Sequence, residues 1–293
     1  MTMAMAETSV RSESFVSDRL SPRDFSRLAL FIEGYSGIKM PPSKATMVEG
    51  RLRKRVRAAG LATLSEYCRY LFDQGGLETE SVYVIDAVTT NKTEFFREPE
   101  HFRVLTHSVL PEINNSRRIS AKAPLKIWSA ACSTGAEPYT LAMVMADFSR
   151  NISGFYTSIL GTDLCTEVLE TSLLGIYTEA MIQPVPRDMR TRYLMRARDV
   201  SRQVVRIVPE LRAMTSFARL NLIASSYPVP KDMDVIFCRN ILIYFDKPTQ
   251  EAVLNRLCEH LRPGGYLFLG HSESLAGFQL PLRPNGNTVF RRV

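Results

Sequence analysis

Short apolar runs alternate with segments of helical periodicity from Leu125 to the end of the chain, and this alternation limits the possible folds more than any other feature. The apolar runs are predicted strands, which cover Leu125 to Ala130, Thr157 to Gly161, Asp234 to Cys238 and Tyr266 to Gly270. The predicted helices among them cover Ala136 to Phe148, Thr166 to Leu174 and Thr249 to Leu261. Strands that alternate with helices form a parallel sheet covered on both faces. We therefore expect a Rossmann-like α/β domain over residues 125–293.

One stretch departs from this alternation. Val204 to Val208 and Ser216 to Leu220 have the pattern of antiparallel strands, and both lie inside the expected α/β domain. We interpret them as a small antiparallel β-subdomain, inserted at about residues 190–220.

The chain before residue 91 has a helical pattern. Ser21 followed by Pro22 is a strong helix start, because serine caps free amides and proline fits the first helical position. Further helices are predicted over Ser43 to Ala59, over Leu64 to Phe72 and from near Glu80. Residues 19–90 are therefore expected to form a small all-α domain.

The remaining segments flank that domain. Residues 1–18 are polar and lack the apolar core of a signal peptide, so we expect a disordered tail. Residues 91–124 are interpreted as a linker with a connecting helix over His101 to Leu110.

The composition favours a globular protein without a membrane span. The chain is 45% hydrophobic and 23% charged, and no apolar stretch reaches the ~20 residues that a membrane helix needs. The five cysteines are odd in number and widely spaced, which is typical of reduced thiols in the cytoplasm. Cysteines and histidines show no metal-ligand spacing. We expect a cytoplasmic monomer with no metal and no membrane insertion.

The net charge of +7 is distributed unevenly. Between Lys39 and Arg69 the chain carries eight basic and two acidic residues, a net charge of +6. Most of these basic residues belong to the second predicted helix, outside its apolar stripe: Arg51, Arg53, Lys54, Arg55 and Arg57. A local excess of positive charge favours an acidic partner, and a simply solvated face is the alternative that the sequence leaves open.

The first predicted strand leads through a turn into a helix. Small residues follow Ala130, a single glycine stands at Gly135, and the helix begins with Ala136 and Glu137. Small residues let a ligand approach the backbone, and a helix N-terminus offers free N–H groups. The three glycines of a dinucleotide fingerprint are absent. The pattern fits a ligand site and an ordinary strand–helix turn alike.

Polar residues also follow two later strands. Asp163 ends the second strand, where a carboxylate can accept hydrogen bonds from ribose hydroxyls; the alternative is a cap for the helix near Thr166. Arg239 and Asn240 follow the fourth strand, at the edge where open α/β sheets bind ligands. Tyr244 lies just beyond, with core packing as its alternative role. Together with the first turn, these residues favour a nucleoside ligand.

Five segments, in order along the chain, carry a resemblance to a known family. They are Thr89 to Arg97, Trp128 to Tyr139, Asp163 to Leu169, Phe237 to Asp246 and Gly270 to Ser274. The chain resembles the CheR family, the chemotaxis receptor methyltransferases, from about Ser21 to the C-terminus. Five ordered matches of this length make coincidence an insufficient explanation.

The resemblance implies a protein-glutamate O-methyltransferase. Such an enzyme transfers a methyl group from S-adenosyl-L-methionine to glutamates on chemoreceptor cytoplasmic helices, and it releases S-adenosyl-L-homocysteine. The implied cofactor contacts are Asn91, Thr93, Arg97, Gly135, Glu137, Asp163, Asn221, Leu222, Arg239 and Asn240. Tyr244 is implied to lie near the transferred methyl group, and we assign Arg97 and Tyr244 to the reacting carboxylate. The basic helix would dock the acidic receptor helices.

Two departures from the family pattern matter. Ala136 replaces the first of two acids that commonly follow the glycine turn, so that contact falls to Glu137 alone. Some members carry a glycine-containing loop that tethers a receptor C-terminal pentapeptide, whereas the stretch from Arg196 to Gln203 has no glycine. We therefore expect an enzyme that does not need the pentapeptide.

Two other functions share some of these sequence features. A nucleic-acid methyltransferase would share the basic helix, but amino-methylating enzymes usually carry an Asp/Asn-Pro-Pro-aromatic segment where this chain has Arg239 to Leu242. The basic segment also has few aromatic residues for base stacking, so we expect no nucleic-acid partner. A regulatory module that binds the cofactor without turnover is disfavoured by the presence of Arg97 and Tyr244.

Overall fold

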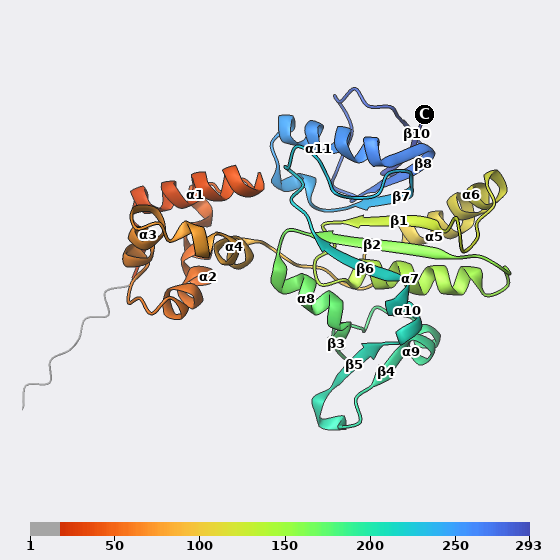
Figure 1. Cartoon of the computed structure of the whole chain (residues 1–293), viewed down its shortest axis with the longest axis horizontal. Coiled ribbons are helices and arrows are strands. Elements are labelled where there is room, and N and C mark those ends of the chain that lie inside the picture. Colours follow the sequence, from red (N-terminus) through yellow and green to blue (C-terminus); the bar gives the residue numbers. More distant parts are fainter. Residues whose placement is uncertain (1–17) are drawn as a thin grey trace, which may run out of the picture.

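The computed structural model of the chain describes residues 18–293, and it places a helical domain beside a domain built on a sheet (Figure 1). The tail predicted for residues 1–18 lies outside the described residues except for Asp18. The Asp18 carboxylate accepts the amide of Leu64 at 3.0 Å, and its carbonyl accepts Arg53 at 2.7 Å. The prediction was wrong for Asp18, because these bonds tie it to the helical domain.

The helical domain has an apolar core of its own. Its elements are α1 (Pro22–Ser36), η1 (Pro42–Lys44), α2 (Ala45–Ala58), α3 (Leu64–Asp73) and α4 (Leu77–Val88). Ser21 caps α1 as predicted, since its Oγ accepts the amide of Asp24 at 3.0 Å. The helix ends before Gly37, whose φ of 73° favours glycine. Leu28 and Leu52 are fully buried between the helices.

The connecting helix after the linker is longer than predicted. It consists of α5 (Glu100–Val104), a π-helical segment η2 (Leu105–Val109) and α6 (Leu110–Ser116). Leu110 and Ile113 are buried in the core of the sheet domain. Packing therefore extends the helix beyond Leu110, into a stretch whose polar sequence had suggested an exposed connection.

The main sheet has seven strands in the order β6-β2-β1-β7-β8-β10-β9. These strands are β1 (Leu125–Ala130), β2 (Thr157–Asp163), β6 (Thr215–Arg219), β7 (Met233–Cys238), β8 (Leu261–Leu269), β9 (Leu282–Pro284) and β10 (Val289–Arg292). From β6 to β8 the pairing is parallel and follows the doubly wound order, which reverses between β1 and β7. Strand β10 is antiparallel to both neighbours, so the sheet is mixed. The sequence prediction missed β9 and β10, which are short.

Helices cover both faces of this sheet, as predicted. The α7 helix (Ala136–Ser149) and the α5–α6 segment pack on one face, against Ile127, Phe237 and Phe268. The α11 helix (Lys247–His260) packs on the other face, against Trp128 and Ile236. Neighbouring residues of a strand point to opposite cores, which explains why these strands are apolar without interruption. The bounds of β1 and of α8 (Thr166–Leu174) match the prediction to the residue.

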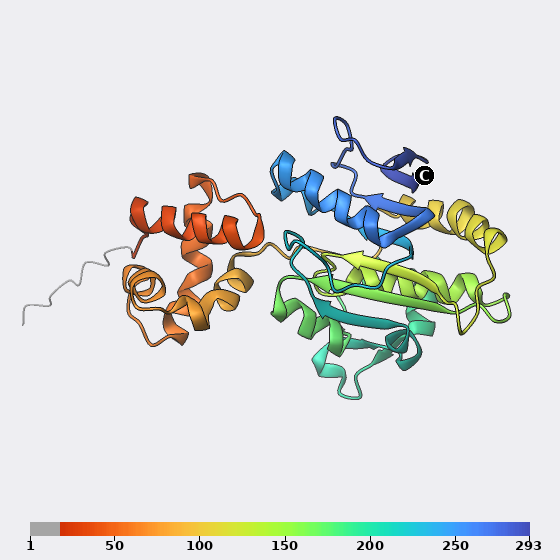
Figure 2. The ribbon, with the colours of Figure 1, turned by 45° about the horizontal axis from the view of Figure 1, so that its top comes forward.

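A second sheet of three antiparallel strands is inserted between α8 and β6, in the order β3-β5-β4. Its strands are β3 (Ile176–Thr178), β4 (Leu194–Arg196) and β5 (Val204–Ile207), accompanied by α9 (Arg187–Tyr193), η3 (Val200–Arg202) and α10 (Pro209–Ala213). It projects from the main domain beyond α8 in both views (Figures 1 and 2).

The prediction for this insertion was wrong in two respects. The inserted sheet begins at Ile176, before the predicted range of about 190–220. The predicted strand Ser216 to Leu220 does not belong to it, because Thr215–Arg219 pairs in parallel with β2 at the edge of the main sheet. An alternating pattern shows which face of a strand is buried but not which strand it pairs with, so it fits both arrangements.

Candidate active site

A cleft lies where the carboxyl ends of the parallel strands face the helical domain. The loops after β1, β2, β6 and β7 contribute to it, together with the linker and the segment that joins α1 to α2. Ten of the eleven predicted catalytic and cofactor residues line it: Asn91, Thr93, Arg97, Glu137, Asp163, Asn221, Leu222, Arg239, Asn240 and Tyr244. The strand order reverses at this edge, which is where open α/β sheets bind ligands.

Gly135 was also predicted to contact the cofactor, but it does not line the cleft. It is buried with a φ of 83°, and a Cβ atom there would lie 2.8 Å from Ser172 Oγ and 3.0 Å from Tyr177 Oη. Only glycine can adopt this positive φ and also fit beside Ser172 and Tyr177 without strain. Gly135 therefore shapes the turn that brings Ser133 into the cleft.

Backbone strain gathers around the same cleft. Within residues 18–293, five of the eight non-glycine residues with positive φ lie in its linker and strand-end loops: Phe96, Glu98, Ala131, Ser133 and Asn240. Such conformations cost on the order of 1–3 kcal/mol each and cluster at functional sites. The strain indicates that the linker, the loop after β1 and the loop after β7 are shaped for a function other than folding.

Asp163, at the end of β2, is held by the turn after β1. Its Oδ2 accepts the amide of Ser133 at 2.8 Å, and its Oδ1 accepts the amide of Cys165 at 3.0 Å. Burial raises the pKa of Asp163, and these amide bonds oppose the rise. The first amide of α8, that of Thr166, instead bonds Asp86 of α4 at 3.0 Å. Asp163 therefore does not cap the Thr166 amide, and its carboxylate keeps acceptor positions for a ligand.

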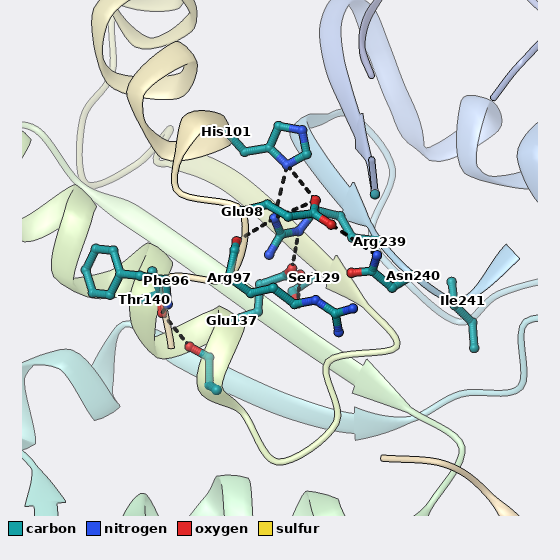
Figure 3. Close-up of polar contacts among 12 residues, drawn as sticks. Phe96, Arg97, Glu98, His101, Ser129, Glu137, Thr140, Arg239, Asn240 and Ile241 are labelled. Atoms are coloured by element: carbon teal, nitrogen blue, oxygen red, sulfur yellow. Dashed lines mark hydrogen bonds and ion pairs between the residues drawn. The ribbon is translucent and has the colours of Figure 1, made fainter. Parts of the chain in front are cut away.

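Arg239 is the centre of a buried polar network (Figure 3). Its Nε donates to Glu137 at 2.7 Å, and its Nη1 donates to the carbonyl of Arg97 at 2.8 Å. Ser129 Oγ donates to the second oxygen of Glu137 at 2.7 Å. Arg239 and Glu137, which were predicted to contact the cofactor, line the cleft, but they bond each other and thereby join β1, β7 and the linker.

Glu98 and His101 extend this network on the linker side (Figure 3). Arg239 Nη1 lies 3.0 Å from His101 Nδ1, and Asn240 Nδ2 donates to Glu98 at 3.1 Å. Burial and the charge of Arg239 lower the pKa of His101 to about 4, so its ring is neutral at neutral pH. Burial alone would raise the pKa of Glu98, but the bond from Asn240 and the charge of Arg239 lower it. Neither residue was predicted to belong to the site.

Glu98, His101 and His271 also bring metal-ligand atoms within 4.8 Å of one another. The guanidinium of Arg239 contacts two of these residues, so a metal ion would meet a fixed positive charge. The cluster is better explained as part of the Arg239 network.

Arg97 and Tyr244, assigned to the reacting carboxylate, reach the cleft from different segments. Arg97 belongs to the linker, and its guanidinium bonds the carbonyl of Lys92 at 3.2 Å without a carboxylate partner within residues 18–293. Tyr244 ends the 3-10 turn η4 (Leu242–Tyr244). Lys44 Nζ, from the helical domain, lies 5.8 Å from the centre of the Tyr244 ring. Two cations, Arg97 and Lys44, and the Tyr244 phenol thus line the same cleft.

Asn221 and Tyr244 also join the two domains. Asn221 Nδ2 donates to the carbonyl of Tyr35 at 2.6 Å, and the amide of Lys39 donates to the carbonyl of Tyr244 at 3.0 Å. Leu222 packs in the apolar core below the cleft. The side-chain amide of Asn221, predicted to bind the cofactor, therefore bridges the sheet domain to the end of α1.

Three of the five basic residues predicted to dock a partner are bound within the chain: Arg51 to the carbonyl of Val88, Arg53 to that of Asp18 and Arg55 to the carboxylate of Glu80, each at 2.7 Å. Lys54 and Arg57 are exposed, and Lys54 Nζ lies 3.9 Å from the carboxylate of Glu167 in the sheet domain. The α2 helix offers a smaller charged surface than the sequence indicated, because an arginine on a helix flank can also tie neighbouring segments together.

Two family models match the chain. The model described as "CheR methyltransferase, all-alpha domain" matches residues 23–89, and "CheR methyltransferase, SAM binding domain" matches residues 91–290. The chain belongs to the CheR methyltransferase family. The resemblance found in the sequence is thereby confirmed.

Curated CheR relatives are similar over nearly their whole length. The chemotaxis protein methyltransferase of Escherichia coli is 37% identical, over 92% of this chain and 91% of the relative. That of Salmonella typhimurium is 36% identical, over 99% and 96%. Chemotaxis protein methyltransferase 1 of Pseudomonas aeruginosa is 38% identical, over 86% and 90%.

The chain is an S-adenosylmethionine-dependent methyltransferase, and the Rossmann-like fold with an all-α N-terminal domain is confirmed. The cleft suits this cofactor, because Asp163 can accept bonds from ribose hydroxyls and Leu164 offers an apolar wall. Among the helices of residues 18–293, none is both long and apolar enough to cross a membrane.

Proposed function

We propose that this CheR-family enzyme methylates glutamate side chains on the cytoplasmic helices of chemoreceptors and gives glutamate methyl esters. The observation that carries the proposal is Arg97, a cation without a carboxylate partner in the described chain, in one cleft with Tyr244 and Asp163. The relatives' name, chemotaxis protein methyltransferase, supports a receptor substrate. Because those helices lie in the cytoplasm, we place the enzyme there.

The chain's own residues act mainly by positioning. S-adenosylmethionine supplies a methyl group that is already activated by its sulfonium. A glutamate carboxylate, with a reference pKa near ~4.3, is an anion at neutral pH and needs no general base. Arg97 and Tyr244 bond the carboxylate oxygen that does not attack and thereby orient the other one. Positioning of this kind contributes up to ~7–11 kcal/mol in the best cases.

The cofactor roles follow the geometry of the cleft. We assign ribose binding to Asp163 and further contacts to Asn91 and Thr93 of the linker and to Asn240. Arg239 and Glu137 stabilise the segments that make these contacts, since their charged groups bond each other.

A labelling experiment tests the function. The full chain is incubated with methyl-labelled cofactor and either receptor cytoplasmic fragments, RNA or DNA. We expect label on the receptor fragments that base releases as methanol, because carboxyl methyl esters are base-labile. Base-stable label, or label on nucleic acid alone, would refute the proposal. Receptor fragments with and without a C-terminal pentapeptide should be labelled equally well.

Replacement of Tyr244 by phenylalanine should lower kcat about 10- to 150-fold, because a hydrogen bond to a charged group contributes roughly 1.5–3 kcal/mol. Cofactor affinity should stay within about twofold, as measured by calorimetry with S-adenosylhomocysteine. Tyr156→Phe, at an exposed tyrosine, is the matched control. Unchanged turnover in Tyr244→Phe would remove the hydroxyl from the mechanism.

Replacement of both Lys54 and Arg57 by glutamine should raise the KM for receptor fragments about 2- to 30-fold, since an exposed ion pair contributes roughly 0.2–1 kcal/mol. The salt dependence of KM should weaken as well. The control is Arg118→Gln with Lys122→Gln, an equal charge change at exposed residues that lie outside the cleft. Equal effects of the two double variants would argue against docking on α2.

A further inference from the structure

The loop after β7 is held by a buried carboxylate that does not itself line the cleft. Glu273, only 5% exposed, accepts four backbone amides. Its Oε1 bonds those of Ile241 at 2.9 Å and Leu242 at 2.7 Å, and its Oε2 bonds those of Asn240 at 2.9 Å and Gly270 at 2.7 Å. Three consecutive amides of one loop thus converge on a single side chain.

This arrangement requires both the loop's shape and the carboxylate's charge. Asn240 adopts a φ of 59°, and a left-handed residue beside right-handed ones turns successive amides toward an anion. Burying a charge is costly unless hydrogen bonds replace its water, and amides fill that need here, since no cation pairs with Glu273 within residues 18–293. Burial raises the pKa of Glu273, and the amide bonds oppose the rise.

The same loop carries the side chains that face the ligands. Asn240, at its start, lines the cleft and bonds Glu98, and Tyr244, at its end, is assigned to the reacting carboxylate. Gly270 closes the loop from the other side, because a Cβ atom there would lie 2.4 Å from Asn240 Nδ2 and 2.9 Å from Asn240 N. Glu273 and Gly270 therefore fix the loop from two independent directions.

We propose that Glu273 is a positioning residue of the methyl transfer, which acts through the amides of Asn240, Ile241 and Leu242 to fix the loop that presents Tyr244. This role rests on the proposed function, because Tyr244 is assigned there to the substrate carboxylate. Glu273 belongs to the Gly270–Ser274 segment, for which no role was predicted from the sequence.

Glu273→Gln tests the role. Glutamine keeps the size of the side chain, but its NH2 group cannot accept bonds and would face amide donors now 2.7–2.9 Å from a carboxylate oxygen. The loop should shift, and a misplacement of about 1 Å can lower a rate about 100-fold. We expect kcat on receptor fragments to fall about 10- to 100-fold, while the Kd for S-adenosylhomocysteine, to which Asn240 of this loop contributes, rises by a smaller factor than kcat falls. Hydrogen exchange of the amides of residues 240–242 should accelerate.

Two further variants complete the test. Gly270→Ala disturbs the same loop without removing a charge, and it should likewise lower kcat by a larger factor than it lowers cofactor affinity. If Glu273→Gln does not fold, the kinetics of Gly270→Ala test whether the position of this loop controls kcat. Glu259→Gln, the same change at an exposed site on α11, should leave all three quantities unaltered.

The outcomes separate this inference from the proposed function. Wild-type kcat in Glu273→Gln, or a loss of kcat no larger than the loss of cofactor affinity, would overturn the positioning role. Unchanged amide exchange at residues 240–242 would overturn it as well. If the wild-type enzyme transfers no methyl group to receptor fragments, the proposed function fails, whereas amide exchange still reports whether Glu273 fixes the loop.

Discussion

Replacement of Arg239 by methionine should lower the free energy of unfolding of the sheet domain by ~3–5 kcal/mol, because it leaves buried carboxylates without their partner. The side chain of Arg239 is 3% exposed, and those of Glu137 and Glu98 are 11% and 13% exposed. Turnover should be lost too, since the linker and β7 are no longer joined. Urea unfolding followed by the fluorescence of Trp128, the only tryptophan and buried in the sheet, measures the effect.

Two further variants show whether the buried charge is the cause. Arg103→Met removes an arginine that is 73% exposed and pairs with Glu100 at 3.0 Å, and it should change stability by less than about 0.5 kcal/mol. Glu137→Gln added to Arg239→Met should restore part of the lost stability, because it removes a carboxylate left unpaired. A loss below about 1 kcal/mol in Arg239→Met would contradict our description of the network.

Replacement of Asp163 by asparagine should raise the Kd for S-adenosylhomocysteine about 10- to 150-fold. Hydrogen bonds to a charged acceptor contribute roughly 1.5–3 kcal/mol, and each 1.4 kcal/mol is a tenfold change in affinity. An asparagine NH2 would also face the amide of Ser133 or of Cys165, which both donate to Asp163. Calorimetric titration of the full chain measures the change.

Asp199→Asn is the matched control for this variant. Asp199 accepts the amide of Ser201 at 3.0 Å, as Asp163 accepts that of Cys165, but it is exposed and lies outside the cleft. If Asp163→Asn lowers thermal stability and leaves the Kd within threefold of the wild type, Asp163 has only a structural role.

Local and periodic features could be predicted from the sequence. The cap at Ser21 needs only its own first turn, and the bounds of β1 and α8 follow from uninterrupted apolar runs and helical spacing. The position of the cleft also followed, because polar residues after consecutive parallel strands must meet at one edge of the sheet.

Long-range bonds to backbone groups could not be predicted in the same way. Glu273 bonds amides 31 to 33 positions earlier in the chain, and an amide leaves no residue type in the sequence to pair with it. Arg51 is similar, because it bonds carbonyl groups at the end of α4. The pairing of β6 with β2 was missed for another reason: period-two patterning does not identify the neighbouring strand.

Two hydrogen bonds between the domains involve main-chain atoms, and this affects which sequence changes the interface between the domains can accept. Asn221 donates to the carbonyl of Tyr35, and the amide of Lys39 donates to the carbonyl of Tyr244. Carbonyls are common to all twenty amino acids and amides to all but proline, so these two bonds survive substitution at positions 35 and 39, whereas the side-chain contacts of Tyr35 with Arg219 and of Lys39 with Asp246 do not. Exchange of the helical domain between related chains should therefore keep these two main-chain bonds, but it also has to preserve the pairing of the Asp86 side chain with Thr166.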